Sequence, residues 1–443
     1  MENQTMEMRK NRRQKFYNSD GVKVHIAKDN SIYPGAVQDL SPTGAAVIIK
    51  GDEDLKLGDE MDVIFYRGEY EFSYRAKIIS ESEYQNPRHE GFGRRLGIVP
   101  VDSETFKIKS VPVMPRKQRY QVNQFLPPTI TATHPLIFNE VMYFRVSELG
   151  ANGLTAHTSL RNVGLSKGMS LQLFLKLPTS PSEIPVSMEI TNIKQVDDHF
   201  RVGFKLREAS MLFNEDVSQY ILATVPGASP ASLRAQGFGV LRTGPSISVS
   251  YSGGAKDVEE ITNLRHTSYS AGNALLKQTP IDDFWDVYDL YSRQLVIRSD
   301  GRIVGACRVI FPNNTASRIE AVNKYKFPIE AELSGISFIE VSRLCVHPEY
   351  QKTDLYYKLL EFCLRIARDT ENRYMLAILL PDRVALFEKL GFKVIGTPID
   401  YPEHRVTLFP MLLDCHLYAS DTAIEKAIEQ RQQSILKNLG DKK

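Results

Sequence analysis

Two arginines and a short acidic motif stand out near the start of the chain. They are Arg9 and Arg13, followed by Asp39, Ser41 and Gly44. The planar guanidinium of arginine binds phosphate oxygens through paired hydrogen bonds and also pairs with the O6 and N7 atoms of guanine. A carboxylate such as that of Asp39 accepts hydrogen bonds from the N–H donors of guanine, and a glycine allows a close backbone approach. The segment therefore has the chemistry to bind a cyclic dinucleotide.

The spacing of these residues resembles the pattern of the PilZ family. That pattern is R-x-x-x-R followed by D/N-x-S-x-x-G, and the chain contains Arg9-x-x-x-Arg13 and Asp39-x-Ser41-x-x-Gly44. The resemblance implies a six-stranded β-barrel that binds cyclic di-GMP through these five residues. The alternative interpretation is a basic N-terminal arm followed by an ordinary Asp–Ser turn. The agreement of both motifs favours the binding site.

Charged residues interrupt apolar, strand-like runs in the last third of the chain. A buried charge requires a partner, so such residues indicate either a structural salt-bridge network or a site of reaction. Glu340 and Arg343 interrupt one such run and Arg308 ends another. Asp286 and Asp289 precede the strand of Arg308, and Arg265 lies on a predicted helix.

The order of these residues resembles the GNAT acyltransferase superfamily, and within it the acyl-homoserine lactone synthases and the N-acyl amino acid synthases. Those branches share an arginine and an aromatic residue on the first helix, a D-x-x-D pair, a G-x-x-R strand end and an E-x-S-R strand. The matching residues are Arg265 with Tyr269, Asp286-x-x-Asp289, Gly305-x-x-Arg308 and Glu340-x-Ser342-Arg343. The resemblance covers roughly residues 255–415. It implies transfer of an acyl group from a thioester to an amine.

This reaction assigns expected roles to the residues. The attacking amine must lose a proton, and Glu340 is the candidate base. Backbone N–H groups near Leu344–Val346 are the expected donors to the oxyanion. An acceptor carboxylate would bind Arg308 or Arg343. Asp286 and Asp289 would bind the acceptor amine or order the first helix, and Arg265 is a further candidate from the shared pattern.

The acyl donor is suggested by a departure from the superfamily pattern. Members that use acetyl-CoA carry Q/R-x-x-G-x-G/A, where N–H groups at a helix start bind pyrophosphate. The corresponding stretch here is Gln351-Lys-Thr-Asp354-Leu-Tyr356, in which larger or charged residues replace the small ones. We therefore expect an acyl carrier protein as donor rather than CoA.

Short β-rich runs at Val22–Ile26, Ala45–Ile49, Met61–Tyr66, Phe72–Ile79 and Leu96–Pro100 predict a barrel in the first part of the chain. Features of this part recur: Arg13 matches Arg119, 106 residues later, and Gly58 matches Gly168, 110 residues later. A fixed offset predicts two copies of one domain. In the second copy Pro115, Glu148 and Gly150 replace three of the motif residues, so we expect it to have lost the ligand.

The predicted organisation is multidomain: two PilZ-like six-stranded β-barrels and a C-terminal α/β (α+β) GNAT-like acyltransferase domain. The expected boundaries are 1–110, 111–224, a linker at 225–249, 250–420, and a charged C-terminal helix at 421–443. The corresponding function is a cyclic di-GMP-responsive N-acyltransferase that uses an acyl carrier protein thioester and a small-molecule amine acceptor. The alternative is a non-catalytic cyclic di-GMP effector whose GNAT-like domain recruits a partner.

Composition excludes several other classes. A formal net charge of +2 is too small for bulk nucleic-acid binding. The polar N-terminus does not resemble a signal peptide, and no run of about 18 apolar residues is present. The four cysteines lack metal-binding spacing, so we expect neither a metal nor disulfides, and a cytoplasmic location. A peripheral membrane contact through a lipid product and a homodimer remain open.

Overall fold

The computed structural model describes residues 13–17, 20–29, 31–50, 54–84, 93–101, 119–137, 140–208, 210–271, 279–312, 319–401 and 406–416. Arg9 and the predicted helix at 421–443 lie outside the described residues. The chain divides into two compact units, Met1–Val225 with Gln236–Gly239, and Pro226–Ala235 with Val240–Lys443. Among the described helices, none has both the length and the apolar character needed to cross a membrane.

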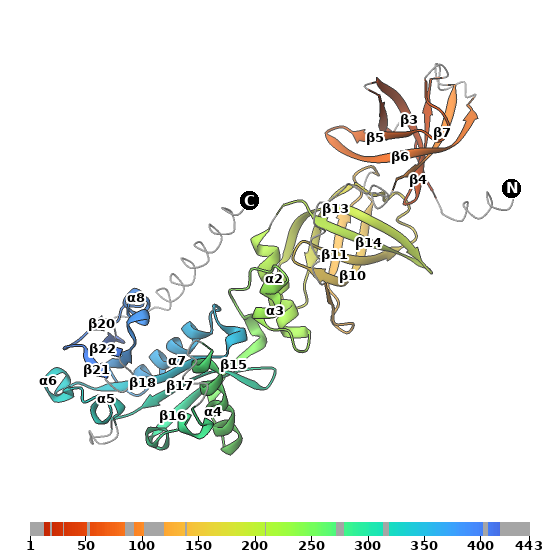
Figure 1. Cartoon of the computed structure of the whole chain (residues 1–443). Helices are drawn as coiled ribbons and strands as arrows, with labels where there is room; N and C mark the ends of the chain where they lie inside the picture. Colours follow the sequence, from red (N-terminus) through yellow and green to blue (C-terminus); the bar gives the residue numbers. More distant parts are fainter. Residues whose placement is uncertain are drawn as a thin grey trace. The chain divides into compact units, whose positions relative to one another are not determined.

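The first part of the N-terminal unit is a closed antiparallel barrel (Figure 1). Its strands alternate between core and solvent: Val24 and Ile26 of β2 are fully buried, while His25 between them is partly exposed. The strand order is β3-β2-β5-β6-β7-β4, β4 pairs back with β3 to close the ring, and β1 extends β3. The strands are β1 (Gln14–Lys15), β2 (Lys23–Lys28), β3 (Ser31–Ser41), β4 (Gly44–Ile49), β5 (Glu60–Arg67), β6 (Tyr70–Glu83) and β7 (Arg94–Pro100).

A second closed barrel follows with the same strand order, β10-β9-β12-β13-β14-β11, and with β8 added to β10. Its elements are β8 (Tyr120–Gln121), β9 (Thr129–Thr133), β10 (Val141–Gly150), β11 (Gly153–Ser159), β12 (Ser170–Lys176), β13 (Glu183–Val196), β14 (His199–Leu206) and α2 (Met211–Thr224). Both barrels also contain a register shift at the same place, between Val37 and Asp39 and between Val146 and Glu148. The prediction of two six-stranded barrels is confirmed.

Two glycines occupy equivalent positions at the start of β4 and β11. A β-carbon on Gly44 would lie 2.2 Å from the carbonyl oxygen of Ile98, and one on Gly153 would lie 2.1 Å from that of Phe204. Both positions require glycine because the neighbouring strand passes too close for any side chain. The Asp39–Gly44 motif thus includes a residue that is needed by the barrel itself.

The C-terminal unit is a mixed sheet in the order β15-β16-β17-β18-β19-β22-β20, with β21 paired to β22. Among the described pairings of this sheet, β18 and β19 run parallel and the others antiparallel. The strands are β15 (Ile247–Tyr251), β16 (Ser292–Ser299), β17 (Arg302–Ile310), β18 (Phe338–Val346), β19 (Tyr374–Leu379), β20 (Lys393–Val394), β21 (Ile399–Tyr401) and β22 (Val406–Asp414).

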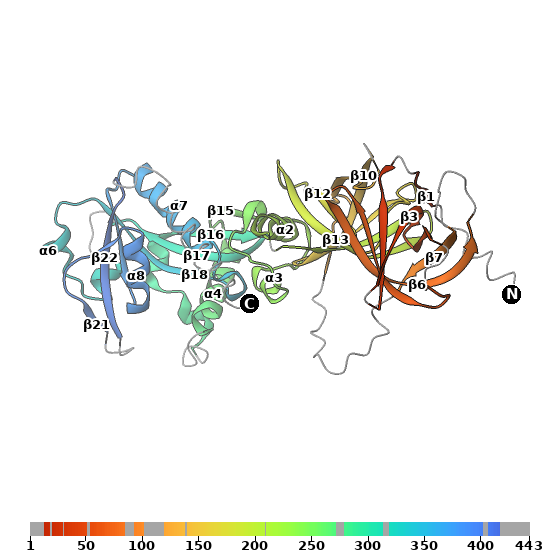
Figure 2. The same ribbon diagram turned by 90° about the horizontal axis from the view of Figure 1, so that it is seen from above.

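Helices cover both faces of this sheet, as Figure 2 shows for α7 and α4. Residues of α7 pack with Leu295 and Ile297 of β16, whereas α4 packs with Val296 between them. Because successive strand residues face opposite sides, the two helices lie on opposite faces. The helices are α3 (Pro230–Ala235), η4 (Gly244–Ser246), α4 (Ala255–Ser270), η6 (Ile281–Phe284), η7 (Val287–Tyr291), α5 (Glu320–Asn323), α6 (Ile329–Leu333), η9 (Pro348–Tyr350), α7 (Leu355–Asp369) and α8 (Pro381–Lys389).

Two segments differ from the sequence-based expectation. Strand β3, which carries Asp39 and Ser41, was not among the expected strands because Pro34 and Gly35 interrupt its pattern. The stretch 225–249, expected as a linker, contains α3 and η4, and its last residues begin β15, which pairs with β16. Leu233 and Val240 are buried, so isolated apolar residues give packed structure to a stretch rich in Gly, Ser and Pro.

Replacement of Gly44 or Gly153 by alanine is expected to destabilise its barrel, because overpacking against a fixed carbonyl costs about 1–3 kcal/mol. Urea or thermal unfolding of G44A and G153A measures this loss. Gly21→Ala is the control: its β-carbon would meet nothing within 4 Å, although its positive φ adds about 1 kcal/mol of strain. Equal losses in G21A and G44A would contradict the close-contact argument.

Candidate functional site

A buried ion pair between α4 and η7 forms the base of the candidate site in the C-terminal unit. The Arg265 guanidinium donates hydrogen bonds of 2.9 Å to both carboxylate oxygens of Asp289. Neither side chain is exposed to solvent, and Gln294 hydrogen-bonds to both of them. A buried ion pair is stable only with good geometry and additional hydrogen bonds. The two residues therefore fix η7 against α4.

Asp286 lies closer to solvent and joins η7 to two further arginines. As the N-cap of η7, its side chain accepts a hydrogen bond of 3.0 Å from the N–H of Tyr288. Its carboxylate also accepts bonds of 2.6 Å from Arg308 and from Arg343. Burial alone would raise the pKa of Asp286, but the charges and hydrogen bonds of the two arginines lower it to about 2. Asp286 is therefore ionised at neutral pH, with 24% of its side chain exposed.

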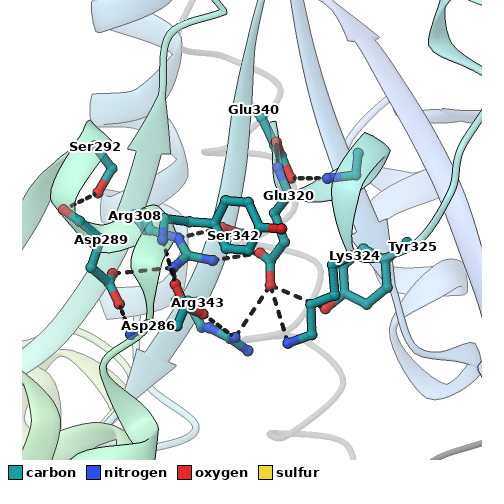
Figure 3. Close-up of polar contacts among 12 residues, drawn as sticks. Asp286, Asp289, Ser292, Arg308, Glu320, Lys324, Tyr325, Glu340, Ser342 and Arg343 are labelled. Atoms are coloured by element: carbon teal, nitrogen blue, oxygen red, sulfur yellow. Dashed lines mark hydrogen bonds and ion pairs between the residues drawn. The ribbon is translucent and has the colours of Figure 1, made fainter. Parts of the chain in front are cut away.

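The Arg308 guanidinium is at the centre of the network (Figure 3). Its terminal nitrogens contact three carboxylates: Asp286, Asp289 at 3.2 Å and Glu320 at 2.5 Å. Its Nε donates to the Ser342 hydroxyl at 2.9 Å. Every nitrogen of this fully buried side chain is thus engaged within the protein, which makes Arg308 a positioning residue.

Glu320, at the start of α5, completes the network and was not identified from the sequence. Its carboxylate contacts Arg308, Arg343 at 3.2 Å and Lys324 at 3.5 Å, as Figure 3 shows. Burial opposes ionisation, but the charges of Arg343 and Arg308 lower the pKa of Glu320. No motif marks this residue, because its two arginine partners come from other elements, the strands β17 and β18.

Glu340 on β18 lies beside Glu320 and is 1% exposed. Its two oxygens accept hydrogen bonds of 3.0 Å from the backbone N–H groups of Glu320 and Ala321. Burial and the negative charge of Glu320 raise the pKa of Glu340 to about 8, against the opposing effect of Arg308 and of these N–H groups. Glu340 therefore orders the start of α5 and is mainly neutral at pH 7.

Strand β18 is distorted just after these residues. Arg343 has a φ of 54°, and two residues, Arg343 and Leu344, lie opposite the single residue Cys307 of β17. A bulge of this kind re-aims side chains and backbone N–H groups. The parallel pairing of β18 with β19 also ends at Glu340. The two strands separate beyond that point, next to the arginine–carboxylate network.

The N-cap residue of α7 is Asp354, whose side chain makes no hydrogen bond to the N–H groups of the helix start. Asp354 is 5% exposed, and one of its oxygens accepts hydrogen bonds from the N–H and the hydroxyl of Thr243, at 3.0 and 2.9 Å. The other oxygen pairs with Lys358 at 2.9 Å. Lys358 thus balances the charge of this buried carboxylate.

In the first barrel the structure brings together four of the five motif residues. Arg13 pairs with Asp39 at 2.8 Å, and the Ser41 hydroxyl donates to the carbonyl oxygen of Gly44 at 3.0 Å. Arg95 of β7 lies 3.6 Å from the other Asp39 oxygen and was not identified from the sequence. The only sign of it in the sequence was the pair Arg94–Arg95 directly before the predicted strand Leu96–Pro100. Asp39 thus lies between two arginines, of which Arg13 keeps 42% of its side chain exposed.

The second barrel has a related cluster, in which the carboxylate of Glu148 accepts hydrogen bonds from several neighbours. Glu148 pairs with Arg201 at 2.9 Å and lies 4.0 Å from Arg119. It also accepts a bond of 2.7 Å from Thr155, which lies across from it where Ala46 lies across from Asp39. Burial alone would raise the pKa of Glu148, but the hydrogen bonds of Thr155 and Gln121 and the charge of Arg201 lower it. Ala46 offers no such hydroxyl to Asp39.

Two family models match the chain. Residues 7–105 match the PilZ domain, and residues 260–414 match the N-acyl amino acid synthase FeeM. Each match covers less than half of the chain, and the PilZ match covers the first barrel. No curated protein matches the sequence.

Solved structures with a similar arrangement include three synthases or transferases. FeeM, an N-acyl amino acid synthase from uncultured soil microbes, is 13% identical, covers 38% of this chain and 91% of its own, and has a TM-score of 0.31. The CoA-dependent acyl-homoserine lactone synthase BjaI is 18% identical over 40% of this chain and 82% of its own, with a TM-score of 0.31. A putative N-acetyltransferase from Lactobacillus plantarum is 13% identical over 38% of this chain and 99% of its own, with a TM-score of 0.29.

Replacement of Asp289 by asparagine is expected to destabilise the C-terminal unit by about 3–5 kcal/mol, because it leaves buried arginine charge unpaired. Asp286→Asn should be milder, since Asp286 is partly exposed. Glu361→Gln, which removes a surface pair with Arg365, should have little effect. Chemical denaturation compares the three variants. A loss in D289N no larger than in E361Q would show that the buried pair is not structural.

Proposed function

We propose that the protein is an N-acyltransferase regulated by cyclic di-GMP, which transfers a fatty acyl group from a carrier-protein thioester to the amine of an amino acid or a similar acceptor. The observation that carries the proposal is the arginine–carboxylate network of Arg308, Asp286, Glu320 and Arg343. It lies at the separation of β18 and β19, within the residues that match an N-acyl amino acid synthase.

The separation of β18 and β19 suits the thioester arm of the donor. Beyond Glu340 the described pairing of β18 with β19 ends, and an extended arm with amide groups can pair with a strand edge of this kind. The end of this pairing supports an acyl thioester as donor.

The start of α7 supports a carrier protein over CoA. A pyrophosphate would need free N–H groups at the helix start, whereas the N-cap position here carries the buried carboxylate of Asp354, which is held by Thr243. A carrier protein presents its thioester arm without a nucleotide, so no pyrophosphate has to bind at the helix start.

The acceptor would bind beside the ion pair of Asp286 and Arg343. The ionised carboxylate of Asp286 would attract the ammonium form of the amine, and Arg343, with 24% of its side chain exposed, would hold the acceptor carboxylate. Arg308, the other residue expected for this role, is fully engaged within the protein.

In the reaction the neutral amine attacks the thioester carbon, a C–N bond forms, the C–S bond breaks and the amine proton is transferred. We assign proton acceptance to Glu340, reached through Glu320 or through water, because a base with a pKa near the working pH is effective. Backbone N–H groups at the β18 bulge, near Leu344, would stabilise the oxyanion. The thiol of the carrier leaves with the proton.

The second candidate is a non-catalytic effector. The observation that favours it is the burial of Glu340, whose two oxygens already accept backbone hydrogen bonds. In that case the arginine–carboxylate network would only stabilise the fold.

The enzyme reading predicts a hydrophobic N-acyl product when the full chain is incubated with acyl carrier protein thioesters and amino acids, detected by mass spectrometry. With a base of pKa about 8, the rate should rise about tenfold per pH unit below pH 8 and then level off. Glu340→Gln should lose this dependence together with most of the activity. Product formation by E340Q at the wild-type rate would contradict the assignment, and no product from any thioester would favour the effector.

The regulatory reading predicts that cyclic di-GMP binds the first barrel through Arg13, Asp39 and Arg95. Calorimetry should show an affinity about 5- to 100-fold lower for Arg95→Ala, because an arginine contact with guanine or phosphate contributes about 1–3 kcal/mol. Arg75→Ala is the control, since Arg75 pairs with Glu60 on β5. Unchanged affinity in R95A would remove β7 from the site.

A further inference from the structure

The outer face of the second barrel carries two adjacent rows of side chains with different chemistry. In one row Tyr143 of β10 and Phe174 of β12 flank Thr131 of β9. Tyr143 is 70% exposed and Phe174 is 45% exposed. These residues are direct cross-strand neighbours, and their side chains point outward because Met142 and Phe144 on either side of Tyr143 are buried.

The next row, two residues along each strand, is basic. Arg145 of β10 and Lys176 of β12 flank Thr129 of β9. The six positions of the two rows contain no acidic residue. Neighbouring strands lie about 5 Å apart, so two aromatic rings and two cations share one compact surface.

A loop extends this surface beyond the basic row. The Arg145 guanidinium donates a hydrogen bond of 3.0 Å to the carbonyl oxygen of Gln124. The next two residues, Phe125 and Leu126, are 93% and 49% exposed. Val141, which precedes Tyr143 on the same face of β10, is 49% exposed. Isolated exposed apolar side chains are common, but five on one surface indicate a binding function.

The equivalent positions of the first barrel show that the fold does not require this chemistry. The shared register shift aligns Tyr143 with Pro34 and Arg145 with Ala36. The equivalent positions on β2 and β5 carry His25 with Ile64 in one row and Lys23 with Tyr66 in the next. Two aromatic residues in one row beside two cations in the next are thus the arrangement of the second barrel.

We propose that this surface, the β9–β10–β12 patch (Phe125, Leu126, Thr129, Thr131, Val141, Tyr143, Arg145, Phe174 and Lys176), binds an anionic phospholipid bilayer. Aromatic side chains favour the boundary between headgroups and acyl chains, and arginine and lysine are attracted to anionic headgroups. The ring of Phe125, which is 93% exposed, enters the interface. The binding does not depend on the proposed catalytic activity.

The test is co-sedimentation of the full chain with vesicles of phosphatidylcholine alone and with vesicles that also contain phosphatidylglycerol. The wild-type protein should bind the second kind preferentially. The double variant Arg145→Glu and Lys176→Glu should lose at least about 25-fold in affinity, since each cation near an anionic surface contributes about fivefold. Phe125→Ser with Tyr143→Ser should lose about tenfold or more through lost apolar contact.

Two matched controls separate the patch from general charge and general apolar effects. Lys194→Glu with Lys205→Glu makes the same charge change on β13 and β14, and Ile32→Ser removes a 65% exposed apolar residue from the first barrel. Both should bind like the wild type. Absence of wild-type binding, or an equal loss in the charge control, would overturn the proposal. A second result would also overturn it. If the wild-type protein binds no vesicles, and sedimentation velocity shows that it is a dimer which F125S/Y143S converts to a monomer, the patch contacts a second copy of the chain.

Discussion

The balance of charge around the buried guanidinium of Arg308 is the constraint on which the C-terminal unit depends. A cation without solvent must be paired with carboxylates at short distance. Asp286 and Asp289 provide two of them from η7, and Glu320 provides the third from α5. Segments that are far apart in the sequence are thus held at one edge of the sheet. The same ion pairs hold Arg343 in a backbone conformation with positive φ, which shapes the bulge of β18.

The network also explains why one carboxylate behaves differently from the others. Three guanidinium groups, those of Arg265, Arg308 and Arg343, are matched by three carboxylates in direct contact with them. Glu340 is the additional carboxylate, and it contacts backbone N–H groups rather than a cation. Burial and the charge of Glu320 therefore raise its pKa to about 8 while the pKa of Asp286 falls to about 2. Neighbouring acids with widely separated pKa values are a property that acid–base chemistry uses.

The two barrels illustrate how one framework can serve different purposes. They share strand order, register shift and the glycine at the start of the fourth strand of each ring. Each also places a carboxylate between two arginines. They differ in the neighbours of the carboxylate and in the chemistry of the outer face. Thr155 and Gln121 donate hydrogen bonds to Glu148 in the second barrel, whereas Ala46 and Lys15 lie opposite Asp39 in the first.

The sequence alone determined the number of barrels and the residues of both motifs, because strand alternation, repeat offset and motif spacing are local properties of the chain. It did not identify β3 as a strand, because Pro34 and Gly35 interrupt the pattern, or Glu320 and Arg95, because their partners come from distant elements. Tertiary structure also decided the roles of residues that the sequence had found. Arg308 is fully buried, and Asp354 pairs with Lys358 and Thr243. Glu340 accepts hydrogen bonds from backbone N–H groups rather than from a cation. These outcomes depend on burial and on the sum of neighbouring charges, which are set only when the sheet, α5 and η7 come together.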